Sequence, residues 1–289
     1  VRLGSKWGHF PETTGTVHYV DAANGSDSNS GTIGSPKATV ISAMGNVSAG
    51  DTVVMYAGTY DMANYFLGSS NNITAAYSIN TTFIAAEPGK VKWTNIEEFT
   101  TTTACTIKYY GIWFSSSTAV WTHLTGNQGA SSSIRYYYNC FFKGLSNSLS
   151  WGYDGQTHMF NCTVDDSFNS SYSNGSGTLQ NTACTSAFTY APGTHPSTGA
   201  AVTSNTNLPS ISLGVDANIS SSGWENTGTG RNPDGTRANI GVYGGPFAWT
   251  KGYAETFGNA PDAAFTNLVA TGDLSAPNID GKPDSYTKL

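Results

Sequence analysis

Short apolar and aromatic runs, each followed by a polar turn, recur through the middle of the chain. Three of them carry Asn after an apolar or aromatic stretch: YYYNCFF at 136–142, HMFNCTV at 158–164 and TLQNTAC at 178–184. A related run, KYYGIWF at 108–114, has Gly in the place of Asn. Runs this short, with no helical periodicity between them, predict β-strands.

The spacing of these runs predicts a solenoid. Asn139, Asn161 and Asn181 lie 22 and then 20 positions apart, which allows one coil per repeat. Each coil would place its strand about 4.8 Å above the last, so equivalent residues would form columns. Asn tolerates a left-handed backbone, and we expect each amide to bond the Asn above and below it. Gly111 fits the same bend for its backbone freedom alone.

Two columns after the bend are predicted to lie in the core. One contains Ile112, Cys140, Cys162 and Thr182, and the other contains Phe114, Phe142, Val164 and Cys184. The cysteines are therefore interpreted as small buried hydrophobic residues. A Cys140–Cys162 disulfide between adjacent coils is the alternative. No C-x-x-C pair is present, so zinc is not predicted.

Two stretches carry a family resemblance. YVDAANGSDSNSGT at 19–32, PKATV at 36–40 and AGDTVVMYAGTY at 49–60 resemble the N-terminal capping module of pectate-lyase-like β-helix proteins, and DGTRANIGVYGGP at 234–246 resembles their closing motif. The resemblance implies an all-β fold, a single-stranded right-handed parallel β-helix with a short N-terminal capping helix. The i, i+3, i+4, i+7 spacing of four apolar residues suits such a helix: Val40, Ala43, Met44 and Val47.

Three segments follow from this resemblance. Residues 1–15 form an N-terminal arm, residues 16–246 the β-helix domain with its cap and closing motif, and residues 247–289 a C-terminal extension that docks or wraps. The scaffold itself does not define a function, because lyases, hydrolases, adhesins and phage fibres share it.

Composition excludes several classes of function. Only 11% of residues are charged, the net charge is −6 and no basic run occurs, so nucleic acid is not an expected partner. No apolar stretch reaches about 18 residues, so membrane insertion is not expected. Aromatic residues make up 12% of the chain, which indicates a folded protein.

The family resemblance implies one candidate chemistry. Pectate-lyase-like enzymes use Ca²⁺ held by carboxylates and an Arg or Lys that removes a proton beside a uronate carboxyl group. Lys108, Tyr136, His158 and Thr178 are predicted to share a column, and Lys143 aligns with Asp165. The candidate catalytic residues are Arg135, His158, Asp165 and Asp166. The alternative is a solvated surface pair of Lys143 and Asp165, worth under about 1 kcal/mol.

A second candidate metal site lies in the N-terminal loop. Asp21, Asp27 and Asn29 offer oxygen ligands in a short segment, which suits a structural Ca²⁺. The alternative is a loop of Asx turns. No cofactor is required by the sequence, and Ca²⁺ is the single candidate.

The aromatic residues suggest a ligand. Flat rings stack on sugars, and the candidate glycan contacts are Tyr109, Trp113, Tyr137 and Trp151. Half of the strand aromatics must nevertheless face the core, whatever the function.

Two functions follow. The preferred prediction is a non-catalytic structural or adhesive protein of a phage virion (tail spike, fibre or capsid decoration) or of a cell surface, binding glycan through its aromatic residues. The expected partners are other virion or surface subunits, a surface glycan and further copies of the chain, at an extracellular or virion-surface location. The alternative is a secreted polysaccharide lyase.

Overall fold

The computed structural model describes residues 4–62, 79–96, 104–115, 122–123, 134–143, 149–150, 156–165, 176–184, 193–194, 201–204 and 226–250. The chain divides into two compact units, Val1–Glu255 and Thr256–Leu289, and every described residue lies in the first. Within these ranges the protein is an all-β parallel solenoid with one short helix.

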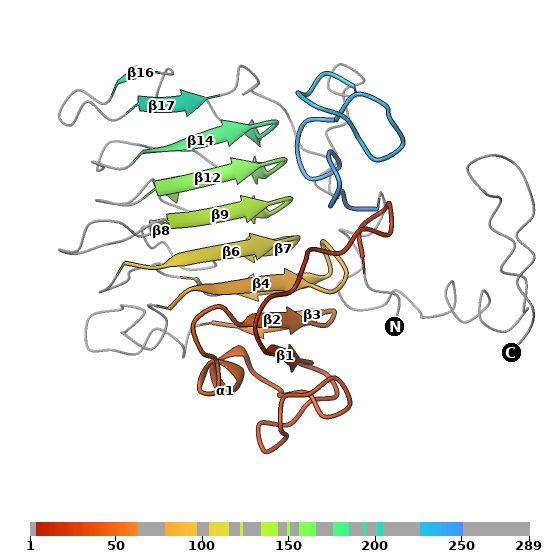
Figure 1. The fold of residues 1–289 in the computed structure, drawn as a ribbon, viewed down its shortest axis with the longest axis vertical. Helices are drawn as coiled ribbons and strands as arrows, with labels where there is room; N and C mark the ends of the chain where they lie inside the picture. The colour runs from red at the N-terminus through yellow and green to blue at the C-terminus, as the bar shows by residue number, and fades with distance from the viewer. Residues whose placement is uncertain are drawn as a thin grey trace, which may run out of the picture. The chain divides into compact units, whose positions relative to one another are not determined.

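Two parallel sheets build the solenoid (Figure 1). The first has nine strands in the order β1 (Val17–Val20), β2 (Thr52–Met55), β4 (Thr81–Ala85), β6 (Thr106–Tyr110), β9 (Ile134–Tyr138), β12 (Gln156–Phe160), β14 (Ser176–Gln180), β17 (Ala201–Ser204) and β16 (Gly193–Thr194). Its one antiparallel pair is β16 with β17. The second has six strands in the order β15 (Ala183–Cys184), β13 (Thr163–Asp165), β10 (Phe141–Lys143), β7 (Ile112–Ser115), β5 (Val91–Thr94) and β3 (Gly58–Asp61). Two short strands, β8 (Thr122–His123) and β11 (Leu149–Ser150), pair separately.

The register confirms the predicted columns. Lys108 pairs with Tyr136, Tyr136 with His158, and His158 with Thr178. Phe114, Phe142, Val164 and Cys184 are likewise aligned strand by strand. A repeat of about twenty residues therefore corresponds to one coil, as predicted.

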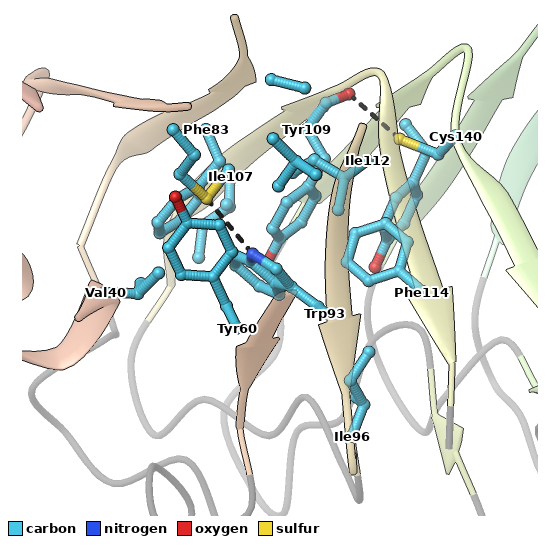
Figure 2. Close-up of a cluster of buried hydrophobic side chains, with 14 of the residues drawn as sticks. Val40, Tyr60, Phe83, Trp93, Ile96, Ile107, Tyr109, Ile112, Phe114 and Cys140 are labelled. Atoms are coloured by element: carbon cyan, nitrogen blue, oxygen red, sulfur yellow. Dashed lines mark hydrogen bonds between the residues drawn. The ribbon is translucent and has the colours of Figure 1, made fainter. Parts of the chain in front are cut away.

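The interior is aromatic (Figure 2). Phe83, Tyr109 and Tyr137 stack in one column, with ring centroids 5.4 and 4.9 Å apart. Trp93 meets Phe83 and Tyr109 edge to face, at 5.3 and 5.9 Å. Stacking equivalent rings from coil to coil buries large apolar areas and adds favourable ring contacts, which stabilises a narrow core.

Three cysteines, Cys105, Cys140 and Cys162, lie in this core as thiols. Cys140 and Cys162 are buried and not bridged. The Cys140 thiol donates to the Tyr109 carbonyl at 3.6 Å, and the Cys162 thiol donates to the Tyr137 carbonyl at 3.3 Å. The prediction that they act as small buried residues is confirmed, and the disulfide alternative is not realised.

Helix α1 (Val40–Met44) begins at Thr39, whose hydroxyl accepts a hydrogen bond from Ser42 N. It lies beside β1 and β2 at one end of the stack (Figure 1). Val40, Ala43 and Met44 are buried in the main core, and Val47 packs partly against it. A short helix is therefore present where the sequence predicted one, although it ends at Met44, before Val47. No described helix has the length and apolar character needed to cross a bilayer.

The bends between the two sheets hold the predicted Asn column. Asn139, Asn161 and Asn181 have φ values of 51°, 53° and 51°, and Gly111 has φ of 70°. The expected amide ladder is not what the structure has. The Asn side chains instead bind the backbone of residues 226–250, which we call the clasp and which is blue in Figure 1.

Each amide has its own partner in the clasp. Asn139 donates to the Val242 and Gly244 carbonyls at 2.9 and 2.7 Å, and Asn161 donates to the Asn239 carbonyl at 3.1 Å. Asn181 donates to the Thr229 carbonyl at 2.8 Å and accepts from Thr229 N at 2.6 Å. The Asn amides, which were expected to bond to one another, thus join the clasp to the coils.

The clasp also meets the N-terminal arm. Ser5 Oγ donates to the Pro246 carbonyl at 2.8 Å, and Lys6 N donates to the Ala248 carbonyl at 2.8 Å. Gly4 N donates to the Ala86 carbonyl at 2.9 Å, next to β4. Residues 4–6 and 246–248 are thus hydrogen-bonded to each other beside the coils.

A buried carboxylate, Asp51, joins β1 to the turn that precedes β2. Asp51 accepts from the His18 ring at 3.0 Å, from Thr16 N at 2.8 Å and from Ser48 N at 2.9 Å. Burial would raise the pKa of Asp51, but these hydrogen bonds outweigh it and hold the pKa below the ordinary 3.8.

This arrangement predicts acid-sensitive stability. Because the folded-state pKa of Asp51 is depressed, its contribution is complete above about pH 4 and is lost as the pH falls through that folded-state pKa. Asp51→Asn should lower the free energy of unfolding at pH 7 by about 1–3 kcal/mol. The difference between D51N and wild type should shrink in urea titrations below pH 4. The exposed Glu12→Gln should show neither effect, and a constant difference at every pH would refute this role of Asp51.

Candidate functional site

Three middle strands of the nine-stranded sheet present aromatic side chains outward. Burial alternates along β6, β9 and β12, so every second residue faces the core. The outward set includes five rings that we call the aromatic face: Tyr110, Tyr136, Tyr138, His158 and Phe160. All five are partly exposed.

The rings of the aromatic face are ordered by strand pairing. Tyr110, Tyr138 and Phe160 form one stacked column, with centroids 4.5 and 5.1 Å apart. Tyr136 and His158 form a second column at 4.7 Å. The Tyr136 and Tyr138 rings are nearly parallel, with centroids 6.2 Å apart, so the two columns are neighbours. Tyr138 is covered on both faces by Tyr110 and Phe160, so this platform offers ring edges and hydroxyl groups whose positions are fixed by backbone pairing.

The aromatic face carries little charge. Burial lowers the pKa of His158, so its imidazole is neutral at pH 7. Burial, and then the neighbouring Tyr138, raise the pKa of Tyr110, and burial followed by Tyr136 raises that of Tyr138. Of the outward side chains described on β6, β9 and β12, Lys108 is the one cation, and none is a carboxylate.

Neighbouring segments limit the aromatic face on one side. Phe247 contacts the Tyr110 ring edge to face at 5.2 Å. Nearer the N-terminal end of the sheet, Phe10 packs against an outer cluster of Val54, Ile84 and Ala86. The outward surface of β2 and β4 is therefore covered, while β9 and β12 keep their rings partly open.

Two of the predicted sugar-binding residues require correction. Tyr109 and Tyr137 are 2% and 0% exposed and stack inside the core, so a surface glycan cannot reach them. Their sequence neighbours Tyr110, Tyr136 and Tyr138 face outward instead. The sequence contained a signal for which residues face outward. The column of Lys108, Tyr136, His158 and Thr178 contains mainly polar residues, and such a column is expected to face solvent.

The two predicted tryptophans lie elsewhere. Trp113, on the six-stranded sheet, packs against Phe141 and the clasp residues Val242 and Trp249, with the Lys92 ammonium 4.8 Å from its ring centroid. Trp113 is therefore a partly buried residue that packs beside the clasp. Trp151 lies outside the described residues.

Among the described residues, the members of the predicted catalytic group do not come together. Arg135 is 1% exposed and points into the core, so it cannot act as a base on a surface polysaccharide. His158 lies on the nine-stranded sheet and Asp165 on the six-stranded sheet. Asp165 is bound to Lys143 at 3.1 Å, the surface pair that was the alternative interpretation. Asp166 lies outside the described residues.

The predicted calcium ligands each have local hydrogen-bond partners. Asp27 accepts from Ala38 N and Thr39 N at 3.1 and 2.9 Å, and Asp21 accepts from Ala23 N and Asn24 N at 2.9 and 3.0 Å. Asn29 donates to the Pro36 carbonyl at 2.8 Å. Nowhere in the described ranges do three His, Cys, Asp or Glu side chains converge. These residues fix the loop that precedes α1, and calcium binding there stays a prediction.

Comparison with known proteins leaves the family open. No protein-family model matches the chain, and no curated protein matches it. The solved structures that resemble it include a rhamnogalacturonan lyase, with 16% identity and a TM-score of 0.45. The alignment covers 59% of this chain and 51% of the lyase, so the chain spans about half of that protein's length. Similarity at this level does not assign a family or an activity.

Proposed function

We propose that the protein is a non-catalytic, glycan-binding β-helix protein whose aromatic face is the binding surface. The stacked outward rings on β6, β9 and β12 carry this proposal. The exposed edges of these rings offer apolar contact to a sugar, and the tyrosine hydroxyls and neighbouring hydroxyl and amide groups can bond sugar hydroxyls. Gln156, Thr178 and Gln180 supply such groups beside the rings.

We further propose that the solenoid is a right-handed parallel β-helix, as the resemblance to pectate-lyase-like proteins implies. Parallel strands joined within one sheet by a crossover are right-handed in about 98% of cases. The short helix at 40–44 and the segment at 234–246, which is hydrogen-bonded to the coil bends, support the same assignment.

The proposed setting is the surface of a phage virion or of a cell. The small number of charged residues and the absence of a basic run favour a role in recognition rather than in nucleic-acid binding. We propose that the partners are a surface glycan, neighbouring virion or surface subunits and further copies of the chain. The proposed function requires no metal, and calcium would serve only to stabilise the N-terminal loop.

The competing function is a polysaccharide lyase. It would need a base and carboxylates on one surface, and Arg135, its proposed base, is inside the core. His158 is outward and neutral, but its ring is stacked on Tyr136 and its hydrogen-bond partner is Gln156 at 3.4 Å. Product analysis distinguishes the two functions, because a lyase shortens the polysaccharide and a binding protein does not.

Tyr138→Ala is expected to weaken glycan binding by about tenfold or more, because the central ring of a stacked platform is an anchor of the kind that dominates recognition. Retardation of wild type and Y138A in native gels containing each of a panel of polysaccharides measures the effect. Tyr19→Ala is the matched control, since Tyr19 stacks on Tyr56 at 6.2 Å at the far end of the same sheet. Equal retardation of Y138A and wild type on every retarding polysaccharide would refute the aromatic face as the binding surface.

A further inference from the structure

Arg135 is a charged side chain in the middle of the core. It is 1% exposed and lies on β9 between Ile107 of β6 and Thr157 of β12. Its guanidinium cannot lose its proton at ordinary pH. A buried charge is costly unless an opposite charge or several hydrogen bonds accompany it.

The hydrogen bonds of Arg135 within the described residues do not balance this charge. Nη1 donates to Cys105 Sγ at 3.5 Å, and a thiol sulfur is a weak acceptor. Nε is buried and has no acceptor. No described Asp or Glu forms a salt bridge with Arg135.

The polar groups near the guanidinium do not supply a negative charge to balance it. Tyr109, Cys105 and Tyr137 act on it electrostatically. Burial raises the pKa of both tyrosines, so their hydroxyls stay protonated at pH 7. These neutral hydroxyls therefore do not supply the negative charge that would balance the guanidinium.

The residues that follow Arg135 in its column become smaller from coil to coil. Arg135 pairs with Thr157, and Thr157 pairs with Gly177, so a large side chain is followed by a small one and then by none. Ile107 on the other side is apolar. A monoatomic ion would therefore compete with the least side-chain volume on the β12 and β14 side, and no described carboxylate pairs with Arg135 there.

We infer that the core binds a small inorganic anion of the halide class at Arg135, next to Nε and on the β12 side. A monoatomic anion supplies the missing charge without requiring the volume of sulfate or phosphate. Binding of this kind stabilises the folded state in proportion to the logarithm of the anion concentration once the site saturates. The site is independent of the aromatic face and of any glycan.

The test compares the unfolding temperature of the full chain in sodium chloride and in sodium gluconate at equal ionic strength. Wild type should gain about 4 °C or more between trace chloride and about 0.3 M chloride, and bromide should act similarly. Arg135→Met should lose this dependence, because it removes the charge and keeps an apolar side chain of similar length. Lys143→Met, which removes a cation from the surface, should retain it.

Two results would overturn the inference. One is a wild-type unfolding temperature that is the same in chloride and gluconate. The other is an R135M variant that keeps the wild-type dependence. If R135M does not fold, crystals grown in bromide decide the matter: an anomalous peak within hydrogen-bonding distance of Arg135 Nε supports the site, and no peak there refutes it.

Discussion

Replacing Trp249 with alanine should lower the free energy of unfolding by about 3–5 kcal/mol and release the clasp from the coils. Trp249 is 0% exposed and packs edge to face on Phe141 and Tyr243, at 6.2 and 6.3 Å. Its indole N–H donates to the Asn139 carbonyl at 2.7 Å. Alanine would remove the ring, leave a cavity and leave a buried carbonyl without its donor.

Urea unfolding of wild type and W249A measures this loss. Trp249→Phe separates the two contributions, since it keeps most of the ring but not the N–H, and we expect it to cost about 1–3 kcal/mol. Ile41→Ala is the control, because Ile41 is 45% exposed and should change stability by under about 0.5 kcal/mol. Limited trypsin digestion at Arg231 and Arg237 should become faster in W249A. Wild-type stability and digestion of W249A would show that the clasp does not depend on this ring.

Replacing Asn139 with alanine is expected to cost about 3 kcal/mol, from two separate causes. The residue has φ of 51°, where a Cβ-bearing side chain other than Asn or Asp is strained by about 1–2 kcal/mol. Its amide also donates to the buried Val242 and Gly244 carbonyls, of which Val242 keeps a second donor in Trp249 N at 2.9 Å. Loss of these bonds should cost about 1–3 kcal/mol.

Glycine at the same position distinguishes the two causes. N139G keeps the backbone conformation and loses only the amide, so its loss in the same urea measurement should be smaller than that of N139A. Asn226→Ala is the matched control, because Asn226 has φ of 58° but is exposed, and it should cost only the backbone part. If N139A and N226A cost the same, the bonds from Asn139 to the clasp contribute nothing.

The sequence was sufficient for the coils because their information is local and periodic. Asn139, Asn161 and Asn181 repeat at a fixed spacing and occupy the same left-handed bend, and the columns beside them follow from strand pairing. The capping helix was likewise predictable, since Val40, Ala43 and Met44 share one helical face. Each of these features depends on short-range spacing alone.

The partners of the Asn amides could not be predicted in the same way. Asn139 and Val242 are 103 positions apart, and no periodicity connects a repeat to a segment outside it. The same holds for Ser5 and Pro246, which are 241 positions apart. An Asn amide can donate a hydrogen bond equally well to a neighbouring Asn or to a backbone carbonyl. Which of the two it bonds depends on where the chain places the clasp.

The predicted sugar-binding residues on β6 and β9, Tyr109 and Tyr137, are each one position away from the outward-facing rings. In β9, Arg135 and Tyr137 point inward while Tyr136 and Tyr138 point outward, which is the reverse of what charge at Arg135 suggests. A one-residue change of phase moves every side chain to the other face. Arginine is rarely buried, so its charge wrongly favoured a surface position for residue 135. Because burying an arginine is costly, its position in the core is also the reason to infer an anion beside it.

The most direct test of a binding rather than a cleaving function is to incubate the purified protein with a panel of neutral and acidic polysaccharides, with and without Ca²⁺. Chain length and the ultraviolet absorbance of unsaturated uronate ends are then followed on every polysaccharide that retards the protein. We expect at least one polysaccharide to retard the protein, with the chain length of that polysaccharide unchanged and no absorbance gained. Shortened chains, with or without new unsaturated ends, would contradict it and show that the protein is an enzyme.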